Sequence, residues 1–334
     1  MNHPRENNEA IRCVAVAGAS GYIGRHVVRE LQQQGYTVVA LVRACSQARC
    51  EHDAFFEGVL IRTCDVTDPR SIAHALYQSP VPDALVSCIA ARDGSPEQAQ
   101  RVDFQANHDL LGAARHLGMS QFILLSAICV QRPVLAFQRA KLAFEAELRA
   151  SELTWSIVRP TAFFKSLAGQ VERIKTGRPF LLFGMRGYGP ACVPISERDT
   201  AAFMVDCLRK PAYADRILPI GGPGPAITPY ERGLLLFTLA GRQPRFRRLP
   251  IALFDSLIPL MAAGGRFSTR LNSAAEFARI GRFYATEPML LRTADGRYNA
   301  WATPRYGHDT LDAFYHHVWH HGMAGQELGE QALF

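Results

Sequence analysis

Several features of membrane-inserted, exported and metal-binding proteins are missing from this 334-residue sequence. It has no uninterrupted run of ~18 apolar residues, the length that a membrane-spanning helix needs. Residues 1–9 are polar and charged and lack the apolar core of a secretory signal, so we expect a short disordered lead there. None of the eight cysteines form the C-x-x-C spacing typical of zinc and iron–sulfur sites. We therefore expect reduced thiols, no metal site and a cytoplasmic protein.

Acidic residues are fewer than basic ones. Lys and Arg total 37 against 30 Asp and Glu, which gives a net charge of +7. The arginines are spread along the chain and no lysine-rich run occurs, so we expect no nucleic-acid partner. An anionic cofactor and an anionic small-molecule substrate account for the excess more simply.

Short apolar runs alternate with longer helical ones between residues 11 and 160. The runs that we expect to form strands are residues 13–17, 37–42, 59–64, 84–89, 121–126 and 155–159. The expected helices between them are residues 24–34, 69–77, 98–117 and 136–150. Continuous apolar strands separated by helices predict a parallel sheet covered on both faces. The fold class is therefore α/β, a doubly wound sheet of the Rossmann type.

The alternation breaks down after Pro160. Residues 177–195 are rich in Gly and Pro, which predicts a loop or lid. Beyond them we expect a helix at 196–208, a strand at 217–220 and a helix at 227–241. We therefore expect a nucleotide-binding domain over residues 10–165, to which 196–225 returns. Residues 166–334 would mainly form a smaller, substrate-binding lobe.

A glycine-rich turn follows the first expected strand and opens the first expected helix. Residues 18–24 have the spacing G-x-x-G-x-x-G. Such a turn brings backbone N–H groups against a pyrophosphate, and the helix N-terminus adds the positive end of its dipole. The alternative is a plain strand-to-helix turn. The predicted cofactor contacts in the turn are Gly18, Ser20, Gly21, Tyr22, Ile23 and Gly24.

Arg43 indicates which dinucleotide binds. It follows the second expected strand, where NAD-preferring folds place an acid on the ribose hydroxyls. No Asp or Glu occurs between Thr37 and Cys50. Because a cation there accommodates a 2′-phosphate, the sequence favours NADP(H) over NAD.

Five other positions carry less specific signals. Arg25 is either a second phosphate contact or a solvated arginine of the first helical turn. Asp65 either contacts the edge of the adenine ring or is only a turn or cap residue. Ser87 and Ala90 follow the fourth expected strand and should lie along the cofactor. Asn107 lies in mid-helix, where a solvent-facing side chain is the commoner case.

The stretch from Phe137 to Lys141 opens a helix after the fifth expected strand. In short-chain dehydrogenases/reductases this place holds Tyr-x-x-x-Lys, with both side chains on one helix face. The tyrosine is the proton donor there, and the lysine binds the nicotinamide ribose. Here the lysine is Lys141 and the tyrosine is replaced by Phe137, which cannot donate a proton. Ordinary carbonyl and alcohol chemistry is therefore not expected, and a surface lysine is the alternative for Lys141.

Residues 249–263 form an almost wholly apolar stretch between basic flanks. The flanking arginines are Arg245, Arg247, Arg248, Arg266 and Arg270. Two interpretations stay open: a buried helix or pocket wall, and an interfacial helix that docks on an anionic membrane.

Four histidines lie near the C-terminus in i,i+4 pairs: His316, His317, His320 and His321. Such pairs can bind a metal on one helix face. No third ligand of obvious spacing accompanies them, so we predict no metal site.

The sequence resembles the NADPH-dependent divinyl chlorophyllide 8-vinyl reductases over nearly its whole length. These are atypical, extended members of the short-chain dehydrogenase/reductase superfamily with NmrA-like relatives. The glycine turn is common to the superfamily, and the later stretches are the specific ones. The stretches that carry the resemblance are residues 16–24, 137–142, 158–167, 219–224, 275–277 and 322–329.

The resemblance implies reduction of the C8 vinyl group of divinyl chlorophyllide or protochlorophyllide to ethyl, in chlorophyll or bacteriochlorophyll biosynthesis. It implies that Lys141 orients the ribose and nicotinamide of NADPH and shares in proton delivery. Phe137 would pack beside the nicotinamide or the macrocycle. The substrate's free propionate needs a cation, and Arg159 and Lys165 are the candidates. The pair Phe163-Phe164 suits a flat apolar ring.

Two other classes of function stay open. A non-catalytic NADPH-binding redox sensor or assembly factor of the NmrA-like type would also lack the tyrosine. A membrane-surface or RNA-associated assembly factor would use the basic flanks of 245–270. The resemblance itself is compatible with a protein peripheral to photosynthetic membranes.

Overall fold

The computed structural model describes residues 11–91, 95–184, 187–264 and 269–323. The expected lead at 1–9, Arg266 and most of the stretch 322–329 lie outside the described residues. The side chain of Arg270 lies outside them as well.

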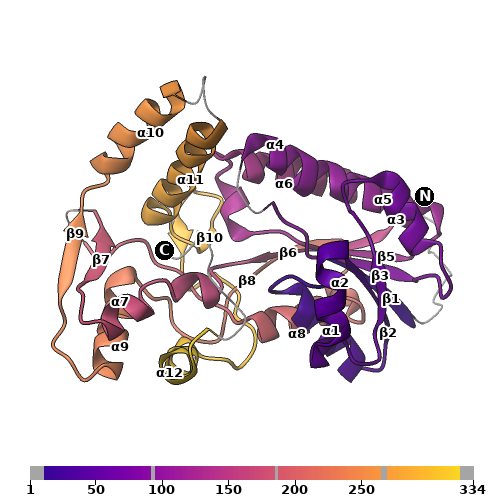
Figure 1. The fold of residues 1–334 in the computed structure, drawn as a ribbon, viewed down its shortest axis with the longest axis horizontal. Helices are drawn as coiled ribbons and strands as arrows, with labels where there is room; N and C mark the ends of the chain where they lie inside the picture. Colours follow the sequence, from indigo (N-terminus) through magenta and orange to yellow (C-terminus); the bar gives the residue numbers. More distant parts are fainter. Residues whose placement is uncertain (1–10, 92–94, 185–186, 265–268, 324–334) are drawn as a thin grey trace.

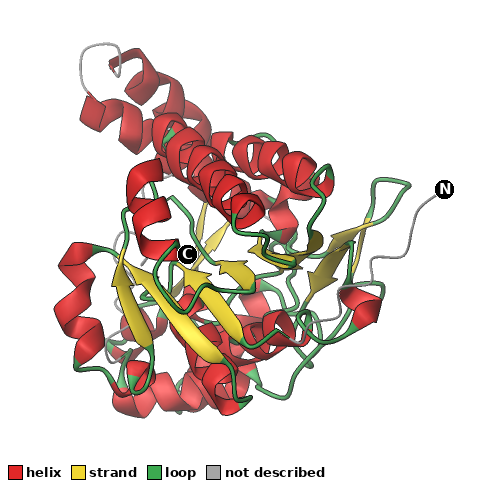
Figure 2. Ribbon diagram, turned by 90° about the vertical axis from the view of Figure 1, so that its right-hand side faces the viewer, coloured by secondary structure: helices red, strands yellow, loops and turns green. Residues whose placement is uncertain are grey.

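A seven-stranded parallel sheet forms the centre of the molecule (Figures 1 and 2). Its strand order is β3-β2-β1-β4-β5-β6-β8. The strands are β1 (Cys13–Ala17), β2 (Thr37–Val42), β3 (Leu60–Thr63), β4 (Ala84–Ser87), β5 (Gln121–Leu125), β6 (Thr154–Pro160) and β8 (Arg216–Ile220). This order confirms the doubly wound α/β fold. Because the order reverses between β1 and β4, the crevice beyond their carboxyl ends is where such folds bind ligands.

Helices cover both faces of the sheet, as Figure 2 shows. Successive residues of β1 point to opposite faces: Val14 and Val16 belong to one core, and Cys13, Ala15 and Ala17 belong to the other. The first core includes side chains of α1 (Gly24–Gln33) and α8 (Glu197–Asp206). The second includes side chains of α3 (Pro69–Leu76), α5 (Asn107–His116) and α6 (Ala136–Arg149).

The helix expected at 98–117 is not one continuous α-helix. It begins as α4 (Pro96–Gln98), continues as a π-helix, η2 (Ala99–Ala106), and returns to α-helix as α5. Asn107 lies where the π-helix ends and is 1% exposed. Its Oδ1 accepts the Ser87 hydroxyl at 2.6 Å, and its Nδ2 donates to the Asp103 carbonyl at 3.1 Å. The expectation of a solvent-facing Asn107 is therefore wrong, since its amide satisfies polar groups inside the fold.

Some elements were not expected from the sequence. Within 177–195 lies β7 (Phe180–Phe183), which pairs in parallel with β9 (Phe246–Leu249). Three helices, α2 (Ala44–Glu51), α7 (Val171–Lys175) and α11 (Thr269–Thr286), had no predicted counterpart. Strand β6 runs through Pro160, where the sequence predicted its end, because Pro160 pairs with Ile220 of the edge strand β8.

A third core lies away from the sheet. It is formed by α7 (Val171–Lys175), β7, α9 (Pro229–Leu239) and α12 (Leu311–His321), with Phe164 and Tyr315 buried among them. Beside it, α10 (Ala252–Gly264) and α11 form a helical pair that projects from the molecule (Figure 1). The short strands β10 (Leu291–Arg292) and β11 (Tyr298–Asn299) pair antiparallel. No helix among the described residues combines the length and the apolarity needed to cross a bilayer.

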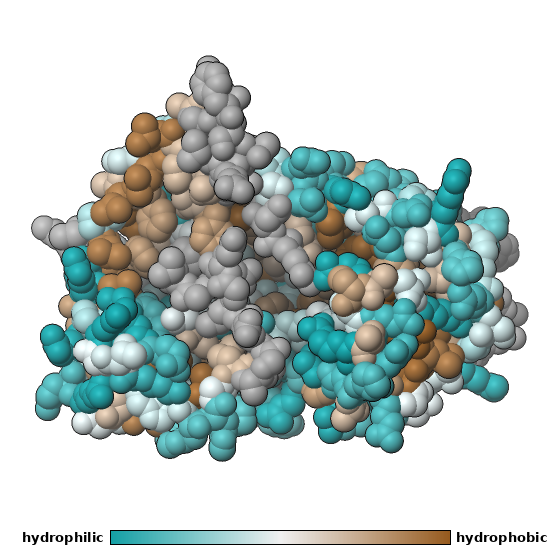
Figure 3. All heavy atoms as spheres, in the orientation of Figure 1, coloured by the Kyte–Doolittle hydropathy of each residue, from teal (hydrophilic) through white to brown (hydrophobic). Residues whose placement is uncertain are grey.

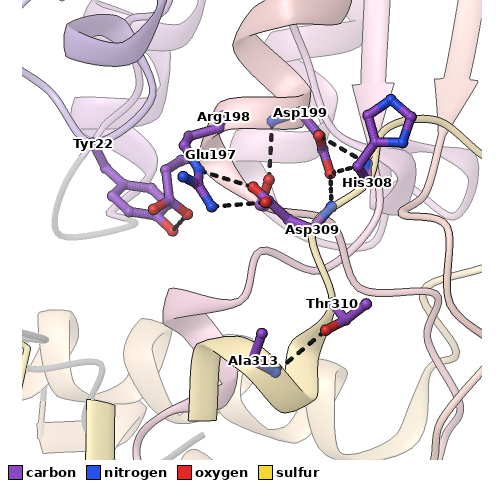
Figure 4. A network of polar contacts seen from close by, with 9 residues as sticks. Tyr22, Glu197, Arg198, Asp199, His308, Asp309, Thr310 and Ala313 are labelled. Atoms are coloured by element: carbon purple, nitrogen blue, oxygen red, sulfur yellow. Dashed lines mark hydrogen bonds and ion pairs between the residues drawn. The ribbon is translucent and has the colours of Figure 1, made fainter. Parts of the chain in front are cut away.

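Polar contacts connect the glycine turn to the C-terminal segment through the start of α8 (Figure 4). Tyr22 donates its hydroxyl to Glu197 Oε2 at 2.5 Å. The Asp199 carboxylate accepts the backbone N–H groups of His308 and Asp309, and Arg198 forms a bidentate pair with Asp309. The turn and the approach to α12 are thus fixed to one short helical segment.

Candidate active site

The glycine turn lies between β1 and α1 with its backbone closely packed. Gly18 has φ +76°, and a Cβ added to it would lie 2.9 Å from the Cys88 carbonyl oxygen. A Cβ at Gly24 would lie 2.1 Å from the Gly18 carbonyl oxygen. The first turn of α1 has no side-chain cap and no acidic residue, so no side chain competes with an anion there. The turn therefore fits the pyrophosphate of a dinucleotide.

Three of the predicted cofactor residues differ in how many partners their side chains already have within the protein. Arg43 lies between β2 and α2, directly before the first residue of α2, and is exposed. Arg25 pairs with Asp53 at 2.9 Å, and its guanidinium lies 4.1 Å from the centre of the Phe55 ring. Asp65 accepts the N–H and hydroxyl of Thr67, which lowers the pKa of its carboxyl. Arg43 is thus the freest of the three to meet a 2′-phosphate, while Arg25 and Asp65 make local contacts.

Ser87 and Ala90 lie at the carboxyl end of β4. Ser87 is buried and its hydroxyl is used by Asn107, whereas Ala90 is exposed and lines a cavity. The cysteine between them, Cys88, lines the same cavity, and burial raises the pKa of its thiol to about 12. Burial also raises the pKa of Cys192, which lines the cavity as well, to about 11. These thiols are therefore neutral at physiological pH.

A large apolar cavity of about 410 Å³ begins at the carboxyl ends of β4, β5 and β6. Its other walls come from the segment after β6 and from β7, α9 and α11. Of the predicted site residues, the structure brings Ala90, Phe137, Lys141 and Phe163 to this cavity. Three residues that the sequence did not single out also line it: Asp103, Arg232 and Tyr284.

Lys141 and Asp103 form an ion pair in the cavity wall, with 2.9 Å between Lys141 Nζ and Asp103 Oδ1. The exposed fractions of the two side chains are 10% and 1%. Asp103 comes from the π-helix, whose wider turn is a frequent device at functional sites. The sequence signal for Asp103 was the unusual Asn107 one turn later, because that amide holds the carbonyl of Asp103. The solvated-surface alternative for Lys141 does not hold.

The aromatic residues predicted for the substrate do not all reach the cavity. Phe163 lines it and makes an edge contact with Tyr22 of the glycine turn, with 6.0 Å between ring centres. Phe164 is instead buried in the third core, away from the sheet, against Phe314. The two rings diverge because neighbouring residues in an extended or turning chain point in different directions.

Neither cation proposed for the propionate reaches the cavity. Arg159 binds Glu145, which also accepts the Ser126 hydroxyl at 2.5 Å. Lys165 lies over the Tyr22 ring, 5.1 Å from its centre, and burial lowers the pKa of its ammonium group. The structure therefore does not bring the propionate candidates to the place where Lys141 and Phe137 meet.

The histidine pairs lie on α12. His316 approaches Asp312 at 3.9 Å, and His317 and His321 are ring neighbours. Among the described residues, no group of three or more His, Cys, Asp or Glu side chains is arranged to hold a metal ion.

Comparison with known proteins agrees with this geometry. A family model described as NAD(P)H-binding matches residues 18–211. The chain is 48% identical to the divinyl chlorophyllide a 8-vinyl-reductase, chloroplastic, of Oryza sativa subsp. indica, over 96% of this chain and 82% of that protein. It is 45% identical to the protein of the same name from Arabidopsis thaliana, over 95% of this chain and 79% of that protein.

Solved structures resemble this one in fold. The crystal structure of an NADPH-dependent quinone oxidoreductase from Escherichia coli, complexed with NADPH, aligns with a TM-score of 0.65 and 18% identity. The alignment covers 92% of this chain and 99% of that one. At this identity the likeness concerns the fold alone. The high identity to the plant proteins over almost all of the sequence is more specific: the chain belongs to the divinyl chlorophyllide a 8-vinyl-reductase family.

Proposed function

We propose that this protein reduces the C8 vinyl group of divinyl chlorophyllide to ethyl with NADPH. The observation that carries the proposal is the 48% identity to a reductase of that name over 96% of this chain. The cavity supports it, because its walls are mainly apolar and it lies at the carboxyl ends of the strands beside Lys141 and Phe137. A flat, apolar macrocycle is the class of substrate that such walls suit.

The glycine turn and Arg43 would hold NADPH, the turn through its backbone N–H groups and Arg43 through the 2′-phosphate. When bound, NADPH supplies a hydride, and the vinyl group also needs one proton to become ethyl. The conjugated macrocycle delocalises the charge that hydride addition creates. A tyrosine hydroxyl at position 137 is therefore not required for charge stabilisation.

Lys141 is the residue that we assign to orientation and proton supply. Its ammonium group carries a proton into the cavity wall, and Asp103, 2.9 Å away, fixes the position of that group. Phe137 lines the same wall and excludes water beside it. The cofactor's ribose and the substrate would thus meet a positioned cation on one side and an aromatic ring on the other.

One assay tests the proposal. Purified protein is incubated with NADPH and divinyl chlorophyllide, and the Soret band is followed by absorption spectroscopy. Conversion to the monovinyl product shifts the band to shorter wavelength. NADPH binding without any shift would contradict the proposal and favour the non-catalytic redox sensor or assembly factor. The same assay with divinyl protochlorophyllide decides between the two substrates.

We also propose that the protein contacts membranes peripherally through α10. Three leucines on this helix, Leu253, Leu257 and Leu260, are 52%, 43% and 71% exposed. Their spacing places them on one side of the helix, and the space-filling view shows an apolar patch over α10 (Figure 3). Arg245, just before β9, and Arg247, within it, are exposed as well. An apolar stripe with nearby arginines suits an anionic bilayer surface.

A further inference from the structure

Not all of the charged side chains that line the cavity have an ion-pair partner of opposite charge. They are Asp103, Lys141, Arg232 and Glu287. Asp103 and Lys141 neutralise each other, and Glu287 pairs with Arg132 and accepts the Tyr298 hydroxyl at 2.9 Å. Among the residues that the structure describes, no carboxylate lies within ion-pair distance of Arg232. The cavity therefore carries one uncompensated positive charge.

Arg232 is positioned to present that charge to a ligand. It lies in the first turns of α9, and neighbouring Pro229 also lines the cavity. The Arg232 Nε is buried and has no hydrogen-bond partner. Its guanidinium hydrogen-bonds to the Tyr315 hydroxyl, which itself donates to the Leu167 carbonyl at 3.0 Å. A half-buried guanidinium whose Nε–H has no partner is unfavourable unless an anion accepts its hydrogen bond.

We propose that Arg232 binds the free carboxylate of the substrate and so determines how the macrocycle enters the cavity. The inference rests on the proposed function, because it takes the divinyl chlorophyllide carboxylate as the ligand. A planar guanidinium can bind a carboxylate through two parallel hydrogen bonds, which gives orientation as well as affinity.

The chemistry of the macrocycle agrees with this placement. The ring that carries C8 and the ring that carries the propionate are diagonally opposite each other. Lys141 comes from α6 along the sheet, whereas Arg232 comes from α9 in the left-hand lobe of Figure 1. A carboxylate held by Arg232 would leave the opposite ring free to reach toward Lys141. The cations predicted from the sequence, Arg159 and Lys165, have other partners.

The test compares divinyl chlorophyllide with its propionate methyl ester, on wild-type protein and on Arg232→Gln and Arg232→Lys. We expect Arg232→Gln to raise KM for the free acid tenfold or more, with kcat changed much less, and to leave kinetics on the ester unchanged. Arg232→Lys should recover part of the affinity for the free acid. Arg216→Gln is the matched control, because Arg216 is exposed at the far end of β8. Arg216→Gln should leave KM and kcat unchanged for both the free acid and the ester.

Equal losses on acid and ester, or a free-acid preference that survives in Arg232→Gln, would overturn the inference. A wild-type protein with no preference for the acid would overturn it without any variant. Equilibrium binding, read by quenching of protein fluorescence, keeps this test separate from turnover. If wild-type protein reduced neither compound, the proposed function would fail, while selective loss of acid binding in Arg232→Gln would still support the role of Arg232.

Discussion

At position 137, phenylalanine keeps an aromatic ring in the cavity wall and removes the hydroxyl that related dehydrogenases use as an acid. The cation four residues later is retained, and its partner comes from a helix more than thirty positions earlier in the sequence. At the scale of single residues, the proposed function therefore assigns the nicotinamide ribose to Lys141, and Phe137 offers no hydroxyl that could protonate an alkoxide.

Replacing Lys141 by methionine tests this assignment. Lys141→Met removes the ammonium group and leaves Asp103 buried without a cation. We expect kcat/KM for the divinyl substrate to fall by roughly 10²–10⁴-fold, the usual contribution of a positioned acid–base group. Lys210→Met, which removes a half-exposed lysine paired with Asp206, is the control. Full kcat/KM in Lys141→Met would remove Lys141 from the mechanism.

A second residue-scale prediction concerns pH and His26. Burial of the imidazole lowers its pKa from 6.5 to about 4. The folded state keeps His26 neutral, whereas the unfolded chain takes up a proton below pH 6.5. The free energy of unfolding therefore has its full value above pH 6.5 and declines as the pH falls toward 4. Urea unfolding of wild type and His26→Gln across this range measures the effect. The wild-type free energy of unfolding should fall more steeply than that of the variant, and parallel curves would contradict the assignment.

At the scale of elements, the glycine turn and the helix after it act as one unit. Gly24 begins α1 and packs on the carbonyl of Gly18, so the turn depends on the absence of a side chain at both positions. The π-helix is another such unit, because its changed register coincides with Asp103 in the cavity wall and Asn107 behind it.

Gly24→Ala and Gly112→Ala form a matched pair. A Cβ at Gly24 would meet backbone 2.1 Å away, whereas a Cβ at Gly112, inside α5, meets nothing within 4 Å. We expect Gly24→Ala to raise the Kd for NADPH at least about tenfold and to lower Tm, since the turn must shift. Gly112→Ala should raise stability by up to about 1 kcal/mol, because alanine favours a helix over glycine. Fluorescence titration measures the Kd for NADPH and thermal unfolding measures stability. Unchanged NADPH affinity in Gly24→Ala would show that the glycine turn does not bind the cofactor.

The exposed face of α10 gives another prediction at this scale. Leu257→Glu combined with Leu260→Glu should reduce co-sedimentation with vesicles that contain phosphatidylglycerol, because it puts charge on the apolar stripe. Val134→Glu combined with Leu60→Glu adds the same charge at exposed positions outside α10, where the side chains are 52% and 40% exposed. This control should keep vesicle binding. Equal losses in both double variants would show an effect of net charge rather than of α10.

At the scale of the whole molecule, the sheet and the third core, which lies away from it, meet around one cavity. Strand β8 returns to the sheet after β7 and α8 have formed, and its neighbour β6 leads directly into the cavity wall. Helix α8 contacts both the segment before α12, through Asp199, and Tyr22 of the glycine turn, through Glu197 (Figure 4). These contacts fix the C-terminal segment and the glycine turn to the same helix. A ligand in the glycine turn should therefore stabilise the fold globally.

Thermal unfolding with cofactor measures this coupling. At 100 times its Kd, NADPH should add about 2.7 kcal/mol to the free energy of unfolding and raise Tm. Arg43→Gln should raise the Kd for NADPH at least about tenfold and leave the Kd for NADH almost unchanged, because only NADPH carries the 2′-phosphate. Equal effects on the two cofactors would exclude Arg43 as the phosphate contact.

The sequence alone was enough to predict the order of the strands up to β6, the glycine turn, Arg43 after β2, and the pair Phe137 and Lys141, but it missed α2 between β2 and β3. These features are local: apolar runs, a glycine spacing and one helical turn contain the information that forms them. Which charged groups line the cavity depends on the tertiary structure. Arg159 and Lys165 follow the same strand, yet both have other partners, while Asp103 and Arg232 arrive from distant elements. Whether a charged side chain faces the cavity depends on which elements pack around it and on which partners it finds there. The spacing of residues along the sequence does not contain this information.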